Sequence, residues 1–189
     1  MSVDFASQRA IMVESQVRVA DVTDYAIQDA MRLVEREALL PAAKAYLAYA
    51  DVEVEYAPGR WLLKARDVGK LLQALRPRPG ERALAIAAPY AAAVMAAMGV
   101  AVTRLDEGDL TAPAGAFDLA ICEGAVAEVP PGWSAALALG GRLAVVQCDG
   151  RIGRAELYVR SEHGVGRRDL FDCAPPIMAG FEPRAAFTF

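Results

Sequence analysis

The stretch PGERALAIAAPYAAAVMAAMG, residues Pro79 to Gly99, has the order of a turn, a strand and a helix. Pro79-Gly80 is a turn signal, residues 83–88 form an apolar run of strand length, and residues 90–98 are uncharged helix formers. In nucleotide-binding α/β folds, the turn between such a strand and its helix is rich in glycine, which lets the backbone approach the ligand. Here the turn is Ala87-Ala88-Pro89, which predicts direct entry into the helix without any residue at left-handed backbone angles.

Composition limits the class of protein. The chain has 189 residues, 55% of them hydrophobic, which is enough to bury a sizeable core. Its net charge of −4 and its scattered basic residues argue against a nucleic-acid partner. The run at 83–102 is uncharged and as long as a membrane span, but Pro89 and Gly99 interrupt it. We therefore expect a buried strand-helix-strand unit there and no membrane segment.

The cysteines indicate the compartment. Cys122, Cys148 and Cys173 are odd in number, widely spaced and set among apolar residues. That pattern is typical of reduced thiols in a core, and it favours neither a disulfide framework nor a metal site. The N-terminal residues also lack the basic and apolar regions of a secretory signal. We expect a cytoplasmic protein that binds no metal.

The remaining pattern predicts an α/β fold with two parts. Residues 1–76 are expected to be a helical extension packed on the core, and residues 77–189 to be one compact core. Thr23 or Asp24 can cap a helix whose apolar residues recur at helical spacing. We expect helices at 4–19, 24–36, 42–50, 66–76 and up to 139, an extended stretch and turn at 51–60, and strands at 100–105, 117–122, 142–147, 155–160, 167–171 and 187–189. The sheet should be mostly parallel with an antiparallel end.

An ordered set of short motifs resembles one enzyme family. The pieces are MVESQVR at 12–18, VTD at 22–24, AM at 30–31, ERE at 35–37, AYAD at 48–51, PGERALAI at 79–86, AFDLAI at 116–121 and LGGRLAVV at 139–146. Together they are similar to the protein-L-isoaspartate O-methyltransferase family, and the tail from Gly150 resembles a bacterial branch of it. The resemblance implies a Rossmann-like methyltransferase fold, S-adenosylmethionine as cofactor, and methyl transfer to isoaspartyl carboxyls in protein repair.

Three regions depart from the pattern of that family. The family has a glycine-rich turn where this chain has residues 87–89, and a loop with serine or threonine hydroxyls where this chain has GRWLL at 59–63. Between the strands at 100–105 and 117–122 the family has a helix, a third strand and an adenine-reading loop, for which residues 106–116 are too short. We expect the third strand, an edge strand, and its helix to be missing, which leaves residues 100–105 near the sheet edge.

These departures favour a catalytically impaired or inactive homologue, a pseudoenzyme that keeps the scaffold and has lost cofactor binding. It would bind a protein partner or a second copy through its N-terminal helices or the uncovered edge. The alternative is an active, diverged S-adenosylmethionine-dependent methyltransferase with an altered cofactor pose or substrate. We assign no catalytic residue under either hypothesis.

Asp106 is the one candidate for cofactor binding. It follows a strand, at the position where an acidic residue commonly accepts hydrogen bonds from ribose hydroxyls. The other interpretation is a solvated loop carboxylate beside Glu107 and Asp109. His163 in a turn and Cys122 as a buried thiol favour structural roles. Glu123 and Glu128 flank the expected cofactor face and are equally consistent with helix caps or surface charges. Trp61 and Trp133 are consistent with lining a pocket or an interface, or with covering the sheet edge.

Overall fold

The computed structural model describes residues 4–111, 113, 115–149 and 152–183. Its N-terminal part is helical, as predicted, and ends in a small antiparallel hairpin. Asp24 caps α2 by accepting the N–H groups of Ala26 and Ile27, at 2.9 and 3.3 Å. The elements are α1 (Phe5–Met12), η1 (Val13–Val17), η2 (Arg18–Ala20), α2 (Tyr25–Leu33), η3 (Arg36–Leu39), η4 (Ala42–Leu47), β1 (Val54–Ala57) and β2 (Arg60–Leu62).

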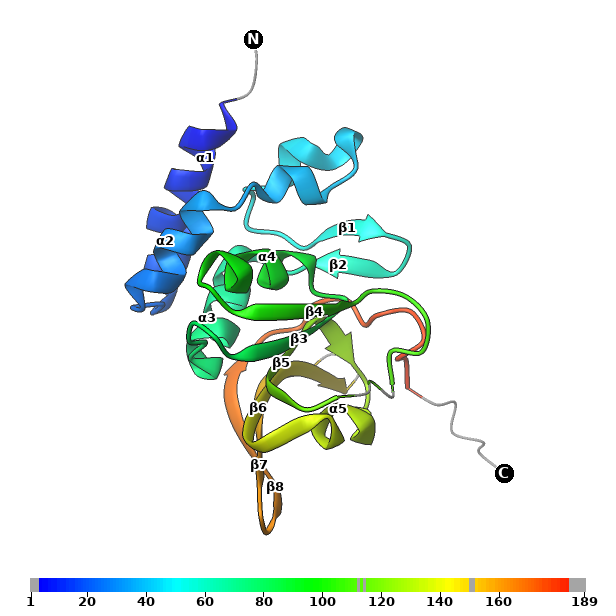
Figure 1. Cartoon of the computed structure of the whole chain (residues 1–189). Coiled ribbons are helices and arrows are strands. Elements are labelled where there is room, and N and C mark those ends of the chain that lie inside the picture. The colour runs from blue at the N-terminus through cyan, green and yellow to red at the C-terminus, as the bar shows by residue number, and fades with distance from the viewer. Residues whose placement is uncertain (1–3, 112, 114, 150–151, 184–189) are drawn as a thin grey trace, which may run out of the picture.

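A six-stranded sheet forms the core, in the order β4-β3-β5-β6-β7-β8. The first four strands in this order are parallel, whereas β7 and β8 pair antiparallel and project as a hairpin (Figure 1). The predicted Rossmann-like class, with a parallel sheet and an antiparallel end, is confirmed. Its elements are α3 (Ala65–Leu75), β3 (Arg82–Ile86), α4 (Pro89–Ala97), β4 (Ala101–Leu105), β5 (Phe117–Val126), α5 (Pro131–Ala135), β6 (Leu137–Asp149), β7 (Ile152–Ser161) and β8 (Gly164–Asp172).

The edge position of β4 confirms the predicted deletion. Among the described residues, β4 pairs only with β3, and the described part of the connection at 106–116 contains neither a helix nor a strand. Loss of an edge strand leaves the central pairs β3–β5 and β5–β6 intact, which is why the fold tolerates it.

The two faces of the sheet carry separate apolar clusters because side chains alternate along each strand. Ala83 and Ala85 of β3 point to the face that α3, α4 and the N-terminal elements cover. Leu84 and Ile86 point to the other face, where α5 and loop residues pack. The boundary expected at residue 76 falls just after α3, and buried side chains from both sides of it form one continuous cluster.

Some element boundaries differ from the prediction. The helix expected to run to residue 139 is wrong, because α5 ends at Ala135 and β6 already starts at Leu137. Gly140, at a φ of 79°, turns the chain inside that strand. The strand expected at 187–189 lies outside the described residues. No helix within the described ranges is both long and apolar enough to cross a bilayer.

Candidate functional site

The parallel strands β3, β4 and β5 end at one edge of the sheet. Ile86 is in register with Leu105 of β4 and with Cys122 of β5. The turn at 87–89, Asp106 and residues 122–124 therefore lie together, and we call this region the carboxyl edge. Ligands of open α/β sheets bind at such an edge, where strand order reverses.

The turn after β3 contains a left-handed residue, contrary to the prediction. Ala87 has a φ of 43°, and its N–H donates to the Leu105 carbonyl oxygen at 2.9 Å. This hydrogen bond and complete burial hold Ala87 in a conformation that costs an L-residue about 1–2 kcal/mol. Pro89 occupies the first turn of α4, as predicted. The turn contains no glycine, but Ala87 adopts the left-handed backbone angle that glycine usually supplies.

Glu123 closes the N-terminus of α4. Its Oε2 accepts hydrogen bonds from the backbone N–H groups of Tyr90 and Ala91, at 2.8 and 3.0 Å. These are groups that a helix leaves unpaired and that attract anions. Burial raises the pKa of Glu123 to about 7, although the nearby Arg36 and the backbone N–H groups oppose that rise. Of the two roles predicted for Glu123, a helix cap is correct and a surface charge is wrong.

Arg36 joins the N-terminal part to this cap. Its side chain is fully buried and donates to the backbone carbonyls of Ala48, at 2.7 Å, and Leu63. The guanidinium lies over the ring of Tyr90, 4.6 Å from its centroid. Arg36 Nη1, the Tyr90 hydroxyl and Glu123 Oε1 are buried and have no hydrogen-bond partner within the described residues. A buried polar cluster therefore lies behind the turn.

The C-terminal segment covers the end of β5. Ile177 pairs with Ala125 in a parallel bridge, and the Met178 N–H donates to the Ala125 carbonyl at 2.9 Å. Met178 is fully buried against Gly124, where a Cβ atom would lie 2.4 Å from its Cγ. Sequence reasoning missed this contact, and the lone glycine within an apolar strand was its only local signal.

The β1–β2 turn holds the other side of the same segment. The N–H of Ala179 donates to the Gly59 carbonyl at 3.2 Å, and Arg60 Nη1 donates to the Ala179 carbonyl at 2.9 Å. Leu62 and Leu63 are buried beneath this turn. Residues of the GRWLL stretch thus contact the C-terminal segment through backbone atoms and one arginine.

Asp106 lies directly after β4, as expected. Arg104 Nη2 contacts Asp106 Oδ2 at 2.8 Å, and the side chain of Asp106 is 31% exposed. Its second oxygen, Oδ1, is buried and has no partner in the part of the chain that the structure describes. Asp106 therefore combines features of both interpretations, and its role in cofactor binding stays a prediction.

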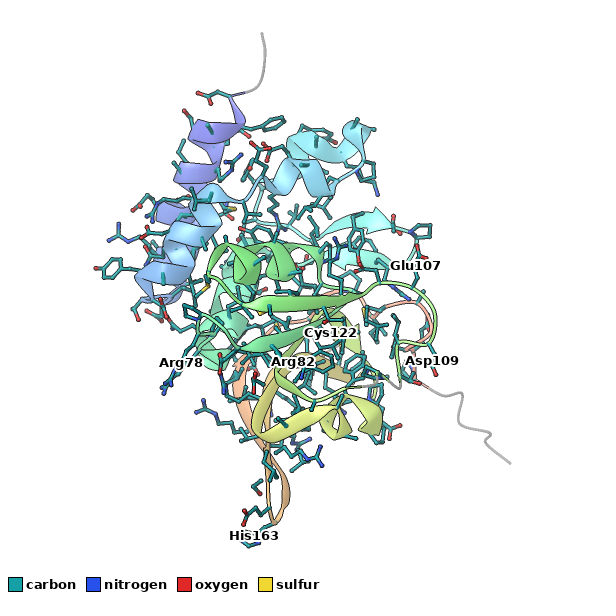
Figure 2. The ribbon with its side chains drawn as sticks, in the orientation of Figure 1. Arg78, Arg82, Glu107, Asp109, Cys122 and His163 are labelled. Carbon is teal, nitrogen blue, oxygen red and sulfur yellow. The ribbon has the colours of Figure 1, made fainter. Side chains whose placement is uncertain are left out.

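The other candidate residues have structural roles or lie on the surface. Cys122 is buried, and burial raises the pKa of its thiol, as expected for an unreactive cysteine. His163 lies at the exposed tip of the β7–β8 hairpin (Figure 2), and Glu128 is also exposed.

Trp133 is buried beneath the sheet and donates its indole N–H to the Leu110 carbonyl, whereas Trp61 is half-buried in β2. Within the described ranges, no three His, Cys, Asp or Glu side chains group closely enough to hold a metal.

Comparison with known proteins identifies the family. A protein-L-isoaspartate O-methyltransferase of Methylorubrum populi is 34% identical over an alignment of 165 positions, which covers 72% of this chain and 78% of that enzyme. The chain belongs to the protein-L-isoaspartate O-methyltransferase family. No family model matches it.

Several other members of the protein-L-isoaspartate O-methyltransferase family match shorter stretches. The enzyme of Methylorubrum extorquens is 41% identical over 105 residues, which span 54% of this chain and 46% of that enzyme.

The fold is also that of solved members. A Plasmodium falciparum enzyme in complex with S-adenosyl-L-homocysteine has a TM-score of 0.75 at 15% identity, over 90% of this chain and 97% of that one. A second protein-L-isoaspartate O-methyltransferase has a TM-score of 0.67 at 17% identity, over 93% of this chain and 66% of that one.

The carboxyl edge does not fit the S-adenosylmethionine of this methyltransferase family in the conformation described. Ala87, Ala88 and Met178 are fully buried, and Glu123 already occupies the first N–H groups of α4. The short connection after Asp106 inserts Leu110 into the apolar cluster on that face. A bound nucleoside would have to displace Met178 and its segment.

Proposed function

We propose that this member of the protein-L-isoaspartate O-methyltransferase family has lost methyl transfer and acts as a protein-binding scaffold in the cytoplasm. The observation that carries the proposal is that side chains of the protein itself fill the carboxyl edge. Glu123 binds the free N–H groups of α4, and Met178 packs into the space over Gly124. Both groups stabilise a closed edge without a ligand.

The chemistry of the reaction supports the same conclusion. When bound, S-adenosylmethionine supplies an activated methyl group, and a carboxylate is already a nucleophile. Most of the rate must therefore come from alignment of the two reactants. In the stretch that corresponds to the hydroxyl-bearing loop of the family, residues 59–63 include no serine or threonine. The buried side chains of Leu62 and Leu63 offer no hydrogen bond to a substrate carboxylate.

Two exposed features support binding of a protein, for which we propose a second copy of the chain. Tyr25 and Leu33 on α2 are 73% and 71% exposed, which is high for such large apolar side chains. The outer edge of β4, which pairs with no strand among the residues that the structure describes, offers backbone groups to another strand. Sedimentation equilibrium should show a dimer that Tyr25→Ser with Leu33→Ser weakens. A monomer at all concentrations would contradict self-association.

An active, diverged methyltransferase is the second candidate. It is favoured by Asp106 Oδ1 and Glu123 Oε1, because both are buried acceptors without a partner among the described residues. Such atoms are costly unless something binds them, and ribose hydroxyls are suitable donors. This function requires the C-terminal segment to move away from Gly124.

Isothermal titration of the intact protein with S-adenosylmethionine and with S-adenosylhomocysteine separates the two candidates. The Methylorubrum populi relative serves as the reference under the same conditions. We expect no saturable heat for this chain and no effect of Asp106→Ala. Saturable one-to-one binding would refute the scaffold proposal. If Asp106→Ala then weakens that binding while the neighbouring Asp109→Ala does not, the methyltransferase alternative is supported.

A further inference from the structure

A polar hollow lies away from the carboxyl edge, and none of the residues of the candidate functional site lines it. It measures about 310 Å³ and is bounded by the N-terminal helical segment, α3 and the end of β8. In Figure 1, α3 lies between the N-terminal helices and the outer strands of the sheet. We call this cavity the α3 hollow. Its polar lining includes Gln16, Asp51, Arg66, Asp67, Lys70 and Asp172.

Asp67 is a buried carboxylate without a hydrogen bond. It is only 7% exposed, and its nearest cation, Arg66 Nε, is 3.8 Å away, which is too long for a hydrogen bond. No other described residue donates to it. Burial raises the pKa of Asp67, because desolvation disfavours its charged form. An acceptor in this state favours a cationic donor that enters the hollow.

Gln16 also lines the hollow. Its Nε2 donates to the Tyr49 carbonyl at 2.8 Å, which fixes the orientation of the side-chain amide. Its Oε1 is buried and has no partner within the described part of the chain. Because this oxygen has almost no accessible surface, a molecule in the hollow does not contact it, and the carboxylate of Asp67, whose side chain is 11% exposed, is the acceptor that a ligand can reach.

Lys70 supplies a positive charge to the same hollow. Its Nζ lies 3.9 Å from the centroid of the Phe171 ring, and it forms no ion pair with any residue described. The other charges are already balanced. Asp51 pairs with Arg66 at 2.9 Å, and Asp172 pairs with Arg154 at 3.1 Å. The free functional groups that a ligand can reach are thus one carboxylate and one cation.

We infer that the α3 hollow binds a free α-amino acid, with its ammonium group on Asp67 and its carboxylate on Lys70. The complementary charges of a zwitterion match these groups. A hollow of about 310 Å³ is at the small end of ligand pockets, which suits a small metabolite. This binding is independent of the carboxyl edge and does not rest on the function proposed for it.

Titration calorimetry of the intact protein tests the inference with L-alanine, L-leucine and L-glutamate as probes. Ethylamine and propionate each carry only one of the two charges. We expect saturable binding of at least one amino acid, and binding of each single-charge analogue at least about tenfold weaker. Absence of saturable binding by all three amino acids would overturn the inference.

Two variants locate the binding site. Asp67→Asn keeps the size of the side chain and removes its charge, and Lys70→Met keeps the stem and removes the ammonium. Each should weaken binding about tenfold or more, while Asp29→Asn, an exposed carboxylate paired with Arg32, should not. If Asp67→Asn fails to fold, Lys70→Met alone decides the question. Unchanged affinity in the folded variants would refute the assignment.

Discussion

Glu123 should make the protein less stable as pH rises from acid to neutral. Burial raises its pKa from an ordinary value of 4.5 to about 7, so between these values the native state holds a proton that the unfolded chain releases. Because the native state binds more protons at Glu123, the contribution of this residue to the free energy of unfolding falls with rising pH in this window and is constant above it. A tenfold change in proton affinity is worth about 1.4 kcal/mol, which gives a total loss of about 3 kcal/mol.

Urea unfolding of the wild type and Glu123→Gln, below pH 4.5 and above pH 7, measures this loss. Glutamine keeps an oxygen for the N–H groups of Tyr90 and Ala91 but does not titrate. From the lower to the higher pH, the free energy of unfolding should fall by about 3 kcal/mol more in the wild type than in the variant. Glu128→Gln, at an exposed site, serves as the control and should follow the wild type. Parallel profiles for the wild type and Glu123→Gln would refute the reasoning.

Four further substitutions test contacts described above, each by urea unfolding at a fixed pH. Trp133→Phe removes the N–H donor to the Leu110 carbonyl and should cost about 1–3 kcal/mol; no loss would contradict this hydrogen bond. Met178→Ala should cost about 2–5 kcal/mol, because it leaves a cavity against the sheet, and a smaller cost would show that the segment packs loosely. Asp24→Ala removes the cap of α2 and should cost about 1 kcal/mol, whereas an unchanged midpoint would argue against the cap. Arg76→Gly, at a φ of 52° after α3, should add about 1 kcal/mol, and a decrease would contradict the left-handed conformation.

Local signals predicted much of the fold. The cap at Asp24 and the helical spacing after it placed α2, and the pattern at 79–99 placed β3 and α4 within a few residues. The short connection at 106–116 predicted that β4 would be an edge strand. These features depend on neighbours in the sequence or on simple chain length, so one sequence suffices to read them.

The closure of the carboxyl edge could not be predicted in the same way. Glu123 follows an apolar run, and nothing beside it indicates that its carboxylate is buried against α4. Met178 reaches Gly124 from a distant part of the chain, so no local pattern reports the contact. Ala87 takes a left-handed angle because a hydrogen bond to β4 requires it, which overrides the preference of alanine.

The geometry of Ala87 bears on whether the loss of glycine in this turn could be reversed. Return to glycine would relieve a backbone cost of about 1–2 kcal/mol while giving up roughly one buried methyl group, worth about 0.8 kcal/mol. The exchange is close to neutral for stability and needs no rearrangement of the chain, since φ is already 43°. A single Ala87→Gly substitution would therefore place a glycine in this turn at little cost, and the obstacle to cofactor binding would remain in the side chains around it, Glu123 and Met178.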